Sequence, residues 1–164
     1  MALGKYVLSS ISSGALRGRA FYALTRQGVP MADYIFPFEK LDVWQLAVDL
    51  AEFVLGSLEQ IPRNMHIRLV SQMEAAATSP AQNIAEGKGR QYKKEFIQFL
   101  HIAQGSVYEV VTLNEVFRRK GLFEEEEAIE TRKRCEQVDR KLNGLINSLR
   151  GRKSYERKAE TRQA

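Results

Sequence analysis

A run of small residues that leads into a cluster of cations, between Gln72 and Glu95, limits the folds open to this chain. Alanine dominates its first half, and a helix face without side-chain bulk lets a neighbouring backbone come close. We therefore expect the closest helix crossing of the fold here, made by Ala75, Ala76, Ala77, Ala81 and Ala85. Gly87, after Asn83 and Glu86, is expected to end that helix in the left-handed conformation. The stretch predicts a close-packed helical hairpin with a basic tip.

Apolar residues recur at helical spacing in four stretches, which predicts helices over about 43–58, 66–86, 92–119 and 124–149. Pro62 separates the first two helices, and Pro80 is expected to kink the second. Asp42 is positioned to cap the first helix, and Gly121 to end the third. The predicted core residues are Trp44, Ala47, Val48, Ala51, Val54, Leu55, Val70, Met73, Ala77, Ile84, Phe96, Phe99, Leu100, Ala103, Val107, Val110, Asn114, Phe117, Cys135, Val138, Leu142, Leu145 and Leu149.

Short connections between four helices predict an all-α fold, an antiparallel up-down-up-down four-helix bundle. In this topology the start of the first helix, the second connection and the end of the fourth helix share one end of the bundle. That end would collect Lys40, the cluster from Lys88 to Lys94, and the basic tail. At the other end, residues 118–120 are basic and residues 124–127 are all glutamate, so their charges largely cancel. The bundle is expected to have one cationic end.

The first helix carries a second apolar set beside its core stripe: Val43, Leu46, Leu50 and Phe53. Monomers rarely leave a wide apolar patch in water, so this set predicts an interface between copies of the chain. A wide core-facing surface in a monomer explains the same pattern equally well.

The two ends of the chain differ from its middle. Residues 1–30 hold four cations and no acid, and residues 150–164 hold six cations and two acids, so the net charge of +5 comes from the ends. The first stretch is typical of an organelle-targeting presequence or of an extension upstream of a start at Met31. We therefore divide the chain into an extension over 1–37, a bundle over 38–150 and a basic tail over 151–164. No apolar run approaches the roughly 18 residues of a membrane span, and a single cysteine fits a reducing, cytoplasmic location.

Patterns of catalytic or metal-binding residues are missing from the sequence. His66 and His101 fall in different helices, without partners at metal-ligand spacing. The Gly-Lys-Gly at 87–89 lacks the spacing of a phosphate-binding loop, and no serine lies in a nucleophile elbow. Cys135 belongs to an apolar stripe and is interpreted as a small core residue. We expect no enzymatic activity, no cofactor and no metal.

The basic cluster remains as the candidate site, for nucleic acid. Lysines and arginines there could contact phosphates while the Tyr92 ring stacks on an unpaired base. The residues concerned are Lys88, Arg90, Tyr92, Lys93 and Lys94, with Arg150, Arg152 and Lys153 from the tail. The alternative is an ordinary solvated helix start, which repetition of the cluster around an oligomer would make less plausible.

Four segments of the sequence resemble the four-helix-bundle proteins encoded by 23S rRNA intervening sequences. These are FEKLDVWQLAVDLAEFV, SQMEAAATSPAQNIAEGKGR, KKEFIQFLHIAQGSVYEV and KLNGLINSLR, in that order between Phe38 and Arg150. The Asn-Ile-Ala-Glu-Gly block at 83–87 is the most specific part. Two departures are Ala75, where relatives commonly have arginine, and Pro80, one residue before the usual proline.

The resemblance implies a small bacterial bundle, homo-oligomeric and pentameric, with an RNA or nucleoprotein role. The family also resembles accessory variability proteins of diversity-generating retroelements, which bind reverse transcriptase and RNA. Two hypotheses follow for this chain: a non-enzymatic oligomer that binds RNA through its basic end, or a scaffold that recruits a protein such as a reverse transcriptase through the apolar side of its first helix.

Overall fold

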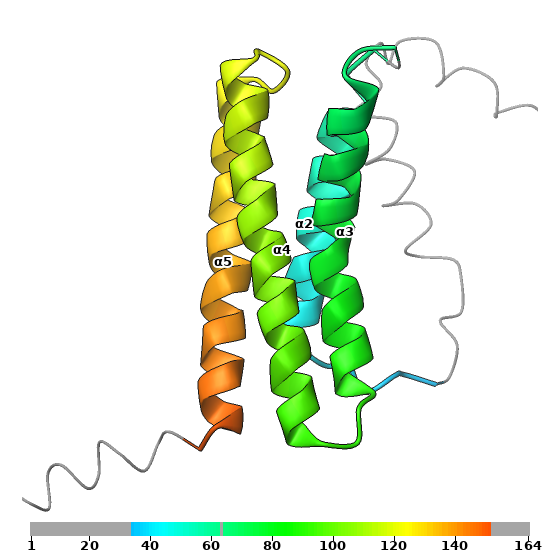
Figure 1. Cartoon of the computed structure of the whole chain (residues 1–164), viewed down its shortest axis with the longest axis vertical. Coiled ribbons are helices and arrows are strands. Elements are labelled where there is room, and N and C mark those ends of the chain that lie inside the picture. The colour runs from blue at the N-terminus through cyan, green and yellow to red at the C-terminus, as the bar shows by residue number, and fades with distance from the viewer. Residues whose placement is uncertain (1–33, 63, 152–164) are drawn as a thin grey trace, which may run out of the picture. The chain divides into compact units, whose positions relative to one another are not determined.

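The computed structural model describes residues 34–62 and 64–151, in which four helices form an antiparallel bundle (Figure 1). The helices are α2 (Asp42–Leu58), α3 (Ile67–Lys88), α4 (Lys93–Arg119) and α5 (Glu125–Leu149). α2 packs on α3, α3 on α4 and α4 on α5, and α5 packs back on α2. This arrangement confirms the predicted fold class. The predicted N-terminal extension up to residue 33, and Arg152 and Lys153 of the tail, lie outside the described residues.

The core follows the predicted apolar stripes closely. Each helix contributes one line of fully or nearly fully buried side chains, so the four lines enclose a continuous apolar interior. Among these residues are Val43, Ala47, Leu50 and Val54 of α2, Met73, Ala77 and Ile84 of α3, Leu100, Ala103, Val107, Val110 and Phe117 of α4, and Cys135, Val138, Leu142 and Ile146 of α5. Seven other residues predicted as core lie only half-buried: Trp44, Val48, Leu55, Val70, Phe99, Leu145 and Leu149.

Two glycines end helices, and for Gly121 this was predicted. Gly121 follows α4 with φ +65°, and the Leu122 N–H donates to the Phe117 carbonyl at 2.9 Å across this turn. Gly151 follows α5 with φ +73°. Left-handed backbone costs glycine little because it has no Cβ atom, so both positions terminate their helices sharply.

The prediction that Gly87 ends α3 is wrong. The helix runs through Pro80 and continues to Lys88, and Gly89 follows it with a right-handed φ of −77°. Gly87 is buried, and a Cβ atom on it would lie 2.5 Å from Phe99 Cβ and 2.9 Å from Phe96 Cδ2. The glycine is therefore required by the close approach of α4. Of the five alanines predicted at this crossing, only Ala76 and Ala77 are fully buried, and Ala75 is exposed.

Asp42 does not cap α2 as predicted. Leu41 occupies the capping position, without a side-chain hydrogen bond, and Asp42 is the first helical residue. Its carboxylate instead accepts a hydrogen bond from Lys141 Nζ of α5 at 3.2 Å. The side chain thus joins the first and last helices of the bundle.

Asn114 is a polar residue within the core line of α4. Its Nδ2 donates to the Ala128 carbonyl of α5 at 2.9 Å, and only 5% of the residue is exposed. Because a buried amide must find a partner, this bond favours a single register of α5 against α4. Asn114 thus acts as a register device between α4 and α5, and its Oδ1 has no hydrogen-bond partner among the described residues.

Candidate nucleic-acid interface

One end of the bundle gathers the predicted basic residues. The start of α2, the connection from α3 to α4 and the end of α5 lie together there, at the lower end of the bundle in Figure 1. We call this surface the basic end and define it by Lys40, Lys88, Arg90, Lys93, Lys94 and Arg150. The opposite end carries the α2–α3 and α4–α5 connections. The antiparallel fold therefore brings together cations that are more than 100 residues apart in the sequence.

The connection between α3 and α4 is short and held by α4's aromatic residues. The Lys88 ammonium lies 5.8 Å from the centroid of the Phe96 ring, and the Arg90 guanidinium lies 4.8 Å from that of Phe99. Arg90 is also ion-paired with Glu86, one turn back. Cations over ring faces and a local ion pair fix the basic segment in one place. Arg90 is consequently the cation of this segment whose charge is already matched.

The lysines of the basic end have no carboxylate partner among the described residues. Lys40, Lys88, Lys93 and Lys94 are exposed, and within the part of the chain that the structure describes they form no ion pair with a carboxylate. Lys93 and Lys94 also open α4, where the helix dipole favours negative charge. Glu95 is the acid of this first turn, and its Oε2 accepts a hydrogen bond from the Tyr92 N–H at 3.3 Å. The local field thus favours an added anion.

Tyr92 stands between these cations at the start of α4. The residue is 62% exposed, a large value for an aromatic side chain. An exposed ring beside lysines is the arrangement in which a base can stack while its phosphates are contacted. Its position is as the sequence predicts, and base stacking on it remains a prediction.

Arg150 connects the end of α5 to the flank of α4. Its Nη2 lies 2.8 Å from Nε2 of His101. No role for His101 was predicted, since no local motif includes it. The bundle topology could have located it. His101 follows Lys94 by two helical turns on α4, the helix that the end of α5 must approach.

At the opposite end of the bundle, two arginines form ion pairs with glutamates. Arg118 bonds to both oxygens of Glu115 at 2.9 Å and reaches Glu125 at 3.3 Å, and Arg119 pairs with Glu115 at 2.7 Å. Hydrogen bonds from Arg118 and Arg119 lower the pKa of Glu115 to about 2. The predicted cancellation of charge at this end is confirmed, although Glu115 contributes more to it than the glutamates at 124–127.

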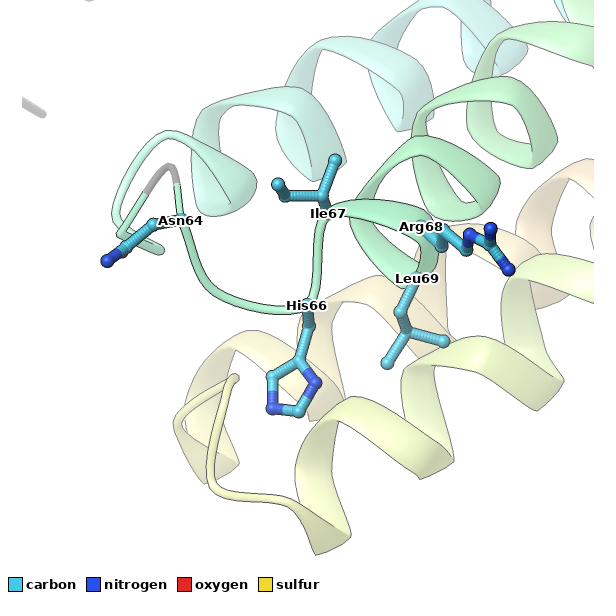
Figure 2. A pocket seen from close by; sticks show the side chains of 5 residues that line it. All are labelled: Asn64, His66, Ile67, Arg68 and Leu69. Carbon is cyan, nitrogen blue, oxygen red and sulfur yellow. The ribbon is translucent and has the colours of Figure 1, made fainter.

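A shallow depression lies at this opposite end, where α3 begins (Figure 2). Asn64, His66, Ile67, Arg68 and Leu69 line it, and their side chains point in different directions. A small-molecule site needs polar groups that converge on a ligand. The depression therefore offers no binding chemistry, and the candidate site remains the basic end.

No group of three or more potential metal ligands occurs within residues 34–62 and 64–151. Cys135 is fully buried, and burial raises the pKa of its thiol to about 12. This burial confirms its assignment to the core. A protonated and enclosed thiol is also a poor nucleophile. None of the described helices is long and apolar enough to cross a membrane.

The burial of Cys135 gives a direct test of the packing. We expect no reaction with a water-soluble aromatic disulfide reagent in the native protein, and one thiol per chain in denaturant. Rapid reaction of the native protein, followed by absorbance, would contradict the placement of Cys135 in the core.

Two of the four residues predicted at an interface on α2 belong to the core. Val43 and Leu50 are 4% and 0% exposed within a single chain, because α2 packs between α3 and α5 and needs a wide core face. Leu46 is only half-buried, and the half-buried Phe53 ring is covered by the Arg134 guanidinium at 4.7 Å. Of these four residues, Leu46 and Phe53 thus retain surface for a contact between copies.

Comparison with known protein families supplies an independent finding. The sequence profile of the 23S rRNA-intervening sequence protein family matches residues 39–144, which is 106 of the 164 residues and includes all of α2, α3 and α4. The chain belongs to this family. The match also covers all but the last turns of α5, so family membership applies to the whole bundle. A search of curated proteins finds no match.

Proposed function

We propose that this member of the 23S rRNA-intervening sequence protein family is a non-enzymatic protein that binds RNA, alone or in a ribonucleoprotein, through its basic end. One observation supports this most strongly. Lys88, Lys93 and Lys94 flank the exposed Tyr92 ring without a carboxylate partner among the described residues, whereas Arg118 and Arg119 at the other end are paired. Unmatched cations beside an exposed ring suit a phosphate backbone with unstacked bases.

Counterion release makes this proposal measurable. Each phosphate neutralised by a lysine or arginine releases bound cations, so affinity falls linearly with salt on logarithmic axes, with a slope of about 0.7 per contact for a single strand. Five contacts from Lys40, Lys88, Lys93, Lys94 and Arg150 would give a slope of roughly 3.5.

The test is fluorescence anisotropy of a labelled oligouridylate of about 20 nucleotides, titrated at several salt concentrations. We expect a steep slope and stronger binding than to a duplex of the same length, whose bases cannot reach Tyr92. Absence of binding at low salt, or a slope near zero, would refute the proposal.

The scaffold hypothesis receives less support. It requires an apolar α2 surface for a partner such as a reverse transcriptase, and the burial of Val43 and Leu50 removes half of that surface. A partner held by protein contacts would stay bound to the purified protein after nuclease treatment, whereas a partner held through RNA would be released.

We further propose that the chain forms a homo-oligomer, a pentamer as the resemblance implies, through the remaining α2 surface around Leu46. Light scattering is expected to give a multiple of the 18.7 kDa chain mass. Leu46→Glu should lower that mass by placing a charge in the contact, and Gln45→Glu, at the exposed neighbouring position, should leave it unchanged. A wild-type monomer at micromolar concentration would overturn this prediction.

A further inference from the structure

The contact between His101 and Arg150 defines which side chain donates and which accepts. A guanidinium has only donors, so the 2.8 Å contact requires His101 Nε2 to accept. A proton on Nε2 of His101 is therefore incompatible with this contact. The Arg150 side chain is held against α4 by an acceptor that carries no negative charge, and within residues 34–62 and 64–151 it forms no ion pair with a carboxylate.

The surroundings of the pair add positive charge. Lys94 precedes His101 by seven residues on α4, which places it on the same side of the helix about 10 Å nearer the basic end. The carboxylate on the α5 side is that of Asp139, one turn further along, which accepts from Gln104 at 2.7 Å and Asn143 at 3.0 Å. Lys88 at the end of α3 and Arg90 in the α3–α4 connection lie over Phe96 and Phe99, on the part of α4 that faces α3.

We infer that His101, Arg150 and Lys94 form a second RNA phosphate contact, on the flank of α4, and that protonation of His101 strengthens it. This inference rests on the proposed RNA binding and extends the contact surface from the α3–α4 connection along α4. The ligand is the phosphodiester backbone of the same strand, two helical turns away from Tyr92.

Protonation of His101 changes which ligand His101 and Arg150 can bind together. A protonated His101 donates through Nε2 and faces a second cation, so the direct contact with Arg150 is lost. A phosphate has enough acceptor oxygens to receive both groups and Lys94. Because the bound phosphate favours the charged imidazole, linkage requires that protonation in turn favours phosphate binding. Histidine is the side chain whose charge ordinarily changes between about pH 5 and 8, which defines the range to examine.

The experiment compares oligouridylate binding at about pH 8 and about pH 6 at equal ionic strength. In the wild type we expect roughly tenfold tighter binding at the lower pH and a salt slope steeper by about 0.7, the value for one added contact. His101→Gln should give the same affinity at both pH values, since the glutamine Oε1 can accept from Arg150 but does not titrate. Circular dichroism would confirm that the variant is folded.

The other histidine provides the matched control. His66 is exposed at the opposite end of the bundle, so His66→Gln should retain the full pH effect. Steep but pH-independent binding by the wild type, or an unchanged pH effect in His101→Gln, would overturn the role of His101 and leave the proposed function intact. Failure of the wild type to bind RNA at either pH would refute both.

Discussion

Gly87→Ala is expected to destabilise the bundle by about 1–3 kcal/mol, the usual cost of forcing extra volume into a packed interior. The added Cβ atom would lie 2.5 Å from Phe99 Cβ, an atom fixed to the α4 backbone that cannot rotate away. The two helices must separate locally, and the Ser79–Ser106 hydrogen bond of 2.8 Å between them would be strained as well. Urea denaturation measures the effect as a lower free energy of unfolding.

Gly105→Ala is the matched control, and its expected effect has the opposite sign. Gly105 lies within α4, and nothing lies within 4 Å of a Cβ atom built on it. Alanine there should stabilise the protein by about 0.5–1 kcal/mol, because glycine loses more backbone entropy in a helix. Similar effects of the two substitutions would contradict the account of Gly87 as a close-packing residue.

The fold was largely predictable because the information lies in local periodicity. The stripes through Ala47, Met73, Val107 and Leu142 repeat at helical spacing, and each became a buried line. Short connections between the helices then predicted one antiparallel topology, which also places the basic residues at one end of the bundle. These features depend on spacing and chain direction alone.

The errors concern features that depend on the neighbouring helix. Gly87 has the sequence pattern of a helix end. A glycine is required there for a different reason, because Phe99 of α4 leaves no room for a Cβ atom. For Val43 and Leu50 the sequence pattern fitted an interface and a wide core face equally well, and the packing of α2 against α3 and α5 places both residues in the core. Similarly, the His101–Arg150 contact joins residues 49 apart and requires the register of α5 on α4.

Simultaneous replacement of Lys88, Lys93 and Lys94 by glutamine is expected to weaken RNA binding by on the order of 100-fold at about 50 mM salt. Three lost phosphate contacts should also lower the salt slope by about 2. The fold should tolerate the change, since removing Lys93 and Lys94 relieves an unfavourable position at the positive end of the α4 dipole. Loss of Lys88 costs only its distant contact with the Phe96 ring.

The matched variant replaces Arg118, Arg119 and Lys120 by glutamine and removes the same charge from the other end. Along α4 these residues lie about 40 Å from Lys93, far beyond the screening length of about 10 Å near 0.1 M salt. Their ion pairs with Glu115 are exposed, so the loss of stability should be small.

The most direct test of the account is therefore the salt slope of oligouridylate binding, measured side by side for the wild type and these two triple variants. We predict that the slope falls by about 2 for the variant at residues 88, 93 and 94 and changes little for the variant at residues 118–120. Equal slopes for the two variants would contradict the assignment of RNA binding to the basic end.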